Sequence, residues 1–250
     1  MKNATLILLI CGSCHIGLLA QDTAKPEKAY KNSIRFNLTN PIIFGTRSIV
    51  FGYERVLNNR RSFSVNIGQA SFPDLKIIDA DSVRANSILG ENGFHISGDY
   101  RFYLSRENKF EAPRGVYIGP YFSYNYFERK NSWTVTSADG GSPKTAETKT
   151  SLSIRSIGFE FGYQFIFWKR LSVDMILLGP GIAGYNLKAS VGANLSDEDR
   201  QKLFDRLNEA LADKFPGYST VIDEGEFRTE GTAKTTNFGF RYMVMIGFRF

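Results

Sequence analysis

The side chains best suited to chemistry in this sequence are His95 and Ser97, two residues apart in a segment that continues to Asp99. A histidine that takes the proton of a serine hydroxyl activates that oxygen for attack on an ester, and an acidic side chain orients the histidine. All three residues share one face if the segment is an extended strand. The pattern fits an acyl hydrolase, but it equally fits hydrogen-bonding residues in a polar interior. We favour the second interpretation and predict no catalytic role.

Charged residues recur at alternate positions of otherwise apolar segments, which is the period of a β-strand. In the last segment, every even position from Phe238 to Phe250 is apolar or aromatic, whereas the odd positions include Arg241 and Arg249. Because a dry core does not accept unpaired charge, the charged faces must meet and form pairs. The predicted network consists of Arg35, Glu54, Asp99, Arg101, Glu160, Asp174, Arg241 and Arg249.

The elements that position these residues are eight predicted strands. They cover residues 31–40, 48–57, 62–71, 94–104, 115–127, 151–167, 170–187 and 236–250. If the strands run up and down in order, the connections at one end of the sheet are short or moderate in length. Those at the other end are long and cover residues 72–93, 128–150 and 188–235. The first link at that second end, 41–47, is an exception because it is short. This pattern predicts an all-β fold, an eight-stranded antiparallel up-and-down transmembrane β-barrel over residues 31–250. We expect its apolar face to lie outside and its charged face inside.

A soluble, lipocalin-like ligand carrier remains an alternative, because such barrels also alternate. Their apolar face lies inside, where large and small residues must mix to fill the space. Here the apolar face is uniformly large and aromatic, with 21 Phe and 12 Tyr in the whole chain. This composition favours the membrane barrel.

Residues 1–20 are predicted to be a cleaved signal peptide. Lys2 precedes an uncharged, mostly apolar stretch that ends at Ala20, a small residue that suits signal peptidase. An uncleaved anchor and a lipoprotein at Cys11 or Cys14 are the alternatives. Cleavage removes both cysteines of the chain, which excludes a disulfide or a cysteine nucleophile in the mature protein. Residues 21–30 are then a short periplasmic leader.

The formal charge of +6, from 31 basic and 25 acidic residues, is explained by the predicted short turns. There Arg60, Arg61, Lys169 and Arg170 would contact lipid phosphates at the periplasmic surface. A nucleic-acid site would need basic residues gathered on one soluble face, so we expect no nucleic-acid partner. The sequence also gives no sign of a metal site or a cofactor.

Several segments resemble a family of small Gram-negative outer-membrane β-barrel proteins, most of unknown function. The similar segments are Gly52-Tyr-Glu-Arg55, Gly98-Asp-Tyr-Arg-Phe-Tyr-Leu104 and Ala112-Pro-Arg-Gly-Val-Tyr-Ile-Gly-Pro-Tyr121. The end of the chain, with Tyr242, Phe248 and Phe250, is similar to the signal that the barrel-assembly machinery recognises. The resemblance implies a location in the outer membrane, among its lipids and lipopolysaccharide, and some barrels of this kind remove acyl chains from lipid A.

The 188–235 connection is predicted to contain one helix, because Ser196 and Asp199 resemble a helix cap and Leu203, Leu207 and Leu211 recur at helical spacing. The helix would lie on the outer loops, where a surface ligand or protein could bind. We therefore expect a monomer with a structural or surface-interaction role and a lumen plugged by charged side chains. A narrow channel for small solutes and a lipid-modifying enzyme acting through His95 and Ser97 are the alternatives.

Overall fold

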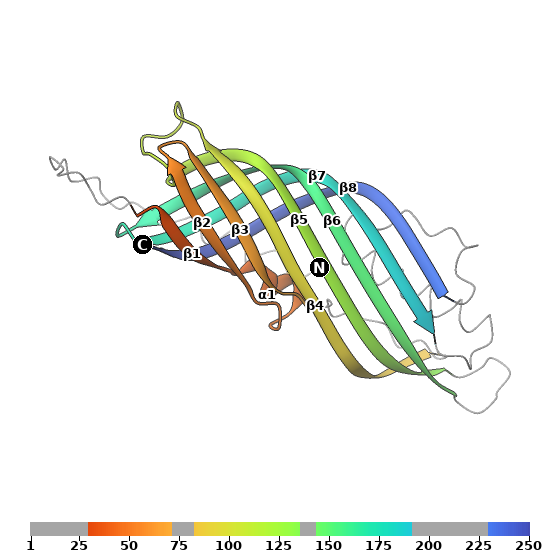
Figure 1. Ribbon diagram of the computed structural model, residues 1–250. Helices are drawn as coiled ribbons and strands as arrows, with labels where there is room; N and C mark the ends of the chain where they lie inside the picture. Colours follow the sequence, from red (N-terminus) through yellow and green to blue (C-terminus); the bar gives the residue numbers. More distant parts are fainter. Residues whose placement is uncertain (1–29, 72–82, 136–143, 192–229) are drawn as a thin grey trace, which may run out of the picture.

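The eight predicted strands form one closed ring. A computed structural model describes residues 30–71, 83–135, 144–191 and 230–250. The strands are β1 (Asn32–Asn37), β2 (Val50–Asn58), β3 (Arg61–Gln69), β4 (Val83–Tyr103), β5 (Gly115–Val135), β6 (Lys144–Phe167), β7 (Leu171–Val191) and β8 (Glu230–Arg249). Each pairs antiparallel with its neighbours, and β8 returns to β1 to close the barrel (Figure 1). The predicted fold class is confirmed.

The wall of the barrel is uneven in height. Strands β1 to β3 are 6 to 9 residues long, whereas β4 to β8 have 20 to 24. The short helix α1 (Thr39–Phe44) follows β1. It takes the place of the last two residues of the predicted strand 31–40, which is wrong there, and continues into a link where no element was predicted. Where β1 stops pairing with β8, Leu38 N–H donates to Val244 O at 2.9 Å and Val244 N–H donates to Thr39 Oγ1 at 2.8 Å. This turn of chain therefore continues the closure of the ring. No helix in the described ranges is long and apolar enough to cross a membrane.

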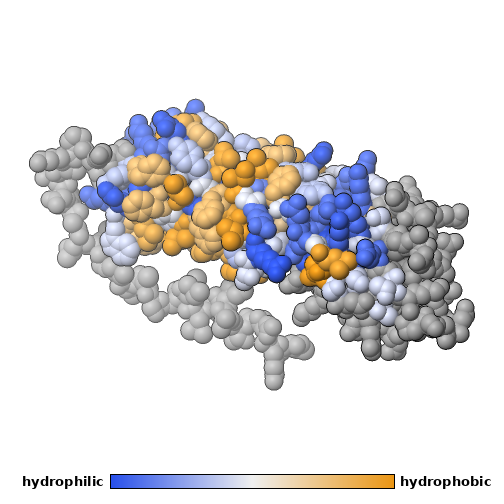
Figure 2. Space-filling view, turned by 60° about the horizontal axis from the view of Figure 1, so that its bottom comes forward, coloured by the Kyte–Doolittle hydropathy of each residue, from blue (hydrophilic) through white to orange (hydrophobic). Residues whose placement is uncertain are grey.

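An apolar belt covers the outside of the ring, because strand side chains alternate between the two faces. Large side chains stand exposed there, among them Phe159 at 69% and Phe238 at 72% of their full surface. Figure 2 shows the hydrophobic residues gathered over the middle of the wall on one face, with hydrophilic residues toward both ends. A soluble carrier would bury these side chains inside. The lipocalin-like alternative is therefore wrong, since the faces have the polarity required in lipid.

Toward the end of the barrel with the long connections, the polarity of the two faces inverts. Large apolar side chains appear on the inward face there, and Phe127, Leu152 and Leu187 are fully buried next to one another in the β5–β6–β7 register. The ring of Phe44 from α1 lies 5.6 Å from that of Phe127, between centroids. The outward neighbours of these three residues are Glu128, Ser151 and Lys188, which also form one row. The ladder thus continues past the belt as a wall with a polar outside, and on its inside this apolar row is followed by buried Arg129 and Thr150.

This inversion explains where the predicted bounds were wrong. Strands β4, β5 and β6 extend 11, 8 and 7 residues farther than the ranges predicted from the alternation, into segments assigned to the long connections. In these added lengths of strand, outward residues are no longer mainly apolar and inward residues are no longer mainly polar. The backbone nevertheless keeps its antiparallel pairing. The signal peptide, most of the leader and the predicted loop helix around Leu203 to Leu211 lie outside the described residues.

Candidate functional site in the barrel lumen

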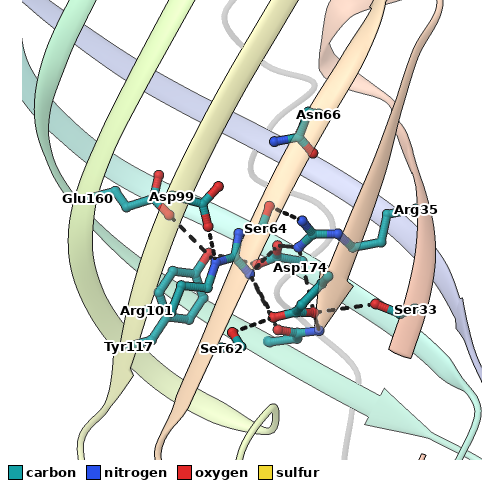
Figure 3. A network of polar contacts seen from close by, with 12 residues as sticks. Ser33, Arg35, Ser62, Ser64, Asn66, Asp99, Arg101, Tyr117, Glu160 and Asp174 are labelled. Carbon is teal, nitrogen blue, oxygen red and sulfur yellow. Dashed lines mark hydrogen bonds and ion pairs between the residues drawn. The ribbon is translucent and has the colours of Figure 1, made fainter. Parts of the chain in front are cut away.

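A layer of buried charges crosses the lumen within the belt. The guanidinium groups of Arg35 on β1 and Arg101 on β4 both contact Asp174 on β7, each with Nη1 2.7 Å from Oδ2. The Tyr117 hydroxyl donates to the other carboxylate oxygen, Oδ1, at 2.7 Å. All four side chains have almost no exposed surface. Figure 3 shows Arg35, Arg101 and Asp174 pointing toward one another from different strands. Asp174 is therefore the point where opposite sides of the ring meet.

Glu54 on β2 forms the second centre of the layer. Its carboxylate accepts hydrogen bonds from Ser62 Oγ at 2.8 Å and from Gln164 Nε2 at 2.9 Å. Arg35 and Arg101 lie 3.7 and 3.5 Å from its oxygens. The Tyr103 hydroxyl donates to Gln164 Oε1 at 2.7 Å and so joins β4 to β6. A buried carboxylate is stable only when it is paired and hydrogen-bonded, and these contacts give Glu54 the partners that its burial requires.

A second group of charges lies in the lumen on the side of Arg101 that faces the end with the long connections. Arg101 Nε donates to Asp99 Oδ1 at 2.6 Å and lies 3.7 Å from Glu160 Oε1. Arg241 on β8 contacts Glu160 Oε2 at 3.1 Å and Asp99 Oδ2 at 3.7 Å. Its guanidinium also lies 5.0 Å from the centre of the Tyr121 ring. The whole layer combines three cations with four carboxylates, so the groups of both signs nearly balance.

Glycines make room for the large side chains of the layer. A Cβ at Gly247 would lie 2.6 Å from Arg35 Cγ and 2.7 Å from Ser172 Oγ. A Cβ at Gly162 would collide with the ring and hydroxyl of Tyr117. Each glycine is the ladder partner of the large residue, Gly247 of Arg35 and Gly162 of Tyr117. The missing side chain therefore leaves room beside an arginine or a tyrosine that enters the narrow lumen.

The structure brings together seven of the eight residues predicted for the charge network. The exception is Arg249, whose Nη1 donates to Lys169 O at 3.1 Å and Nη2 to Tyr30 O at 2.7 Å. As the last residue of β8, it lies at the short-turn end of the ring, below the charge layer. Arg249 was assigned to the network only because it falls at an odd position of the last strand, on the same face as Arg241. This part of the prediction is wrong.

His95 and Ser97 also face the lumen, and their geometry resembles part of a catalytic triad. His95 Nε2 lies 3.1 Å from Ser97 Oγ, and His95 Nδ1 lies 2.7 Å from Asn125 Oδ1. Asn125 thus takes the place for which Asp99 was considered, because Asp99 is bound to Arg101. Asn66 Nδ2 and Arg241 Nη2 both donate to the serine oxygen, at 3.1 and 3.4 Å. With 1% of its surface exposed, this hydroxyl has the environment of a structural hydrogen-bonding group.

Several members of the layer were missed in the sequence. Tyr103 and Gln164 fall at the same alternate positions as the charged residues predicted for the network in their own strands, and this was the available signal. The signal was overlooked because tyrosine is common on both faces of this barrel. Tyr117 had no such signal, because the predicted strand 115–127 contains no charged residue. Asn125 gave no signal of its own, since its contact with His95 depends on the β4–β5 register.

The cations predicted to contact headgroups lie at the short-turn end. Arg61 lies 5.7 Å from the Phe102 ring, and Arg170 lies 5.0 and 5.6 Å from the rings of Tyr30 and Phe248. Arg60 and Lys169 belong to the turns themselves, before β3 and before β7. Arginine above an aromatic ring is a favourable arrangement at a membrane surface. Contact of these four residues with lipid phosphate remains a prediction.

The proposed assembly signal lies on the outer face. Tyr242, Phe248 and Phe250 are between 50% and 59% exposed. Tyr242 and Phe248 alternate with inward residues along β8, and Phe250 follows the strand. They are therefore accessible on the outside of the wall at which the ring closes. Recognition by the assembly machinery remains a prediction.

A closed antiparallel ring with an apolar exterior and a charged interior defines the class of this protein. It is a small transmembrane β-barrel of the outer-membrane type, since only a closed sheet satisfies all of its backbone groups in lipid. The predicted outer-membrane barrel is confirmed at this level.

Two solved structures are similar in fold. The crystal structure of Acinetobacter baumannii CarO2 aligns with 88% of this chain and 97% of its own, at 11% identity and a TM-score of 0.36. A major outer membrane protein from Thermus thermophilus aligns with 88% of this chain and 98% of its own, at 9% identity and a TM-score of 0.32. No protein-family model and no curated protein matches the chain. The two likenesses are too weak to carry an argument about function.

Proposed function

We propose that this protein is a plugged outer-membrane barrel that acts through its wall and its outer surface and does not conduct solutes through its lumen. The observation that carries this proposal is the complete burial of Arg35 and Arg101 where both bind Asp174. A hydrated ion that passed this layer would have to separate charge pairs that are fully buried. That separation is costly in a low dielectric.

The small diameter of the ring supports the same role. Eight strands enclose a space that side chains alone can fill, and the layer receives a side chain from every strand, with Ser62 and Ser64 representing β3. At the same height, between Asp174 and Arg241 in the β7–β8 register, Ile176, Met243 and Met245 pack with Tyr103 and Tyr117 as a buried apolar cluster. Polar and apolar side chains thus fill the lumen together at this height.

Single-channel recording in planar bilayers tests the proposal. The wild-type protein is expected to give no steady conductance. The double variant Arg101→Ala/Asp174→Ala removes one charge of each sign and is expected to conduct, because it removes the centre of the plug without changing the net charge. Arg155→Gln, on the outer wall, is the matched control and should remain silent.

The same recording distinguishes the alternative of a narrow channel. A steady wild-type conductance that shifts in Arg101→Gln and in Glu160→Gln would mean that ions pass beside these side chains. The plugged-barrel proposal would then be abandoned in favour of a channel for small solutes.

A further inference from the structure

A polar groove of about 550 Å³ lies on the outer wall of the barrel, just beyond the apolar belt. Its lining comes from four adjacent strands, β5 to β8. Its charged and hydroxyl-bearing lining residues include Glu128, Lys149, Ser151, Ser153, Arg155 and Lys188. Most of these side chains point outward, so the groove is separate from the lumen and from the charge layer.

The groove has a floor of small hydroxyl side chains between long cations. Ser151 and Ser153 lie at its centre on β6, with Arg155 on the side of the belt and Lys149 on the far side. Lys188 pairs with Ser151 across the β6–β7 ladder. Three cations therefore reach over a surface that offers hydroxyl donors and leaves space above it.

Glu128 is the carboxylate among the lining residues. It accepts a hydrogen bond from Tyr126 Oη at 2.9 Å and lies 3.2 Å from Lys149 Nζ. The hydrogen bond from Tyr126 and the neighbouring ammonium of Lys149 hold the pKa of Glu128, which lies beyond the belt, below its usual range. One cation is thus partly neutralised, while Arg155 and Lys188 leave the groove with an excess of positive charge.

The groove opens directly onto the apolar belt. Arg155 pairs with Tyr124 on β5 and Gly184 on β7, and the next row toward the belt is Phe122, Ile157 and Ile182. All three residues of that row are about half exposed or more. A ligand that fills the groove therefore touches cations and hydroxyls with one part and a lipid-facing apolar wall with the other. This combination fits an amphiphile with an anionic headgroup.

We propose that this groove binds the phosphorylated headgroup of an outer-leaflet glycolipid, with the acyl chains lying over Ile157 and Ile182. The long connections place this end of the barrel at the cell surface, where the outer leaflet ends against the belt. Guanidinium and ammonium groups form charge-assisted hydrogen bonds with phosphate oxygens, and the serine hydroxyls can donate to sugar or phosphate oxygens. The proposal does not depend on whether the lumen conducts.

Binding of defined lipids to the full-length protein in detergent tests the proposal. The probes are lipid A with its phosphates, lipid A from which the phosphates have been removed, and inorganic phosphate. The test variant is Lys149→Gln/Arg155→Gln/Lys188→Gln. The control variant, Arg55→Gln/Arg106→Gln/Lys109→Gln, removes the same charge from the short-turn half of the barrel at exposed residues. Folding of every variant is checked by the different migration of unboiled and boiled samples on a gel.

Phosphorylated lipid A is expected to bind the wild type, and the test variant should bind it at least about tenfold more weakly, because each basic residue near an anionic surface contributes to attraction. The control variant should keep the wild-type affinity. Glu128→Gln should tighten binding, since it removes a negative charge and frees Lys149. Dephosphorylated lipid A should bind the wild type as weakly as phosphorylated lipid A binds the test variant.

Three results would overturn the proposal. Equal losses in the test and control variants would mean general charge attraction. Equal binding of the two forms of lipid A would mean recognition of acyl chains alone. Binding of inorganic phosphate that blocks the groove as effectively as the lipid would identify a phosphate site that needs no lipid.

Discussion

Arg35 and Arg101 share one acceptor: Nη1 of each guanidinium lies 2.7 Å from Asp174 Oδ2. The two arginines come from strands β1 and β4, and Asp174 comes from β7. A single oxygen atom therefore ties three separated parts of the ring together. The short hairpin of β2 and β3 lies between the two arginines and contributes Glu54 and Ser64 to the same layer.

Asp174→Asn is expected to destabilise the barrel. The variant preserves the shape of the side chain but leaves two buried guanidinium groups without their shared carboxylate. Removing one partner of a buried ion pair costs about 3 to 5 kcal/mol. The measurement is the urea midpoint of unfolding in detergent. Glu147→Gln, on the exposed face of β6, should stay within about 0.5 kcal/mol of the wild type, and a similar midpoint for the two variants would contradict the assigned role of Asp174.

Gly162→Ala is expected to disturb the layer through Tyr117. The new methyl group would collide with the tyrosine ring and hydroxyl, and overpacking of a filled interior costs about 1 to 3 kcal/mol. The same unfolding measurement applies. Gly184→Ala is the matched control, since the nearest atoms to its Cβ lie 3.9 Å away. If both variants unfold alike, the space at Gly162 is not needed by Tyr117.

Phe159→Arg tests the assignment of the belt. This side chain is exposed and lies between Ile157 and Phe161 on the outer face of β6. An arginine facing the lipid destabilises a barrel by about 2 to 4 kcal/mol near the midplane and by about 0 to 1 near the interface. Folding into lipid vesicles measures the difference. Thr145→Arg, on the same face of the same strand beyond the belt, should fold normally. If both variants fold equally well, Phe159 does not face the lipid and the assigned belt is wrong at this position.

Ser97→Ala is expected to leave lipid A unchanged. Its hydroxyl is buried and bonded to His95, Asn66 and Arg241, so its loss should lower stability by about 1 to 3 kcal/mol through unpaired partners without removing an activity. Mass spectrometry of lipid A compares cells that produce the wild type, the variant and neither. A change in acylation that requires both Ser97 and His95 would establish a lipid-modifying enzyme and contradict this prediction.

The sequence predicted the ring and its polarity because alternation has a local cause. Each residue of β8 is directed in or out by the strand geometry alone, so Phe248 and Arg241 could be assigned to faces without knowing their neighbours. The same reasoning identified seven members of the charge layer. It was wrong for Arg249, because parity gives the face of a residue but not its depth in the barrel.

The sequence by itself determined the number of strands, their up-and-down order and which face meets lipid, since these follow from residue types at a period of two. Only the tertiary structure decided which charges meet, where the belt ends and that Asn125 stands beside His95. Those relationships depend on the register between strands and on the closure of the ring. A contact such as that of Arg35 with Asp174, 139 positions apart, depends on both and has no local signal.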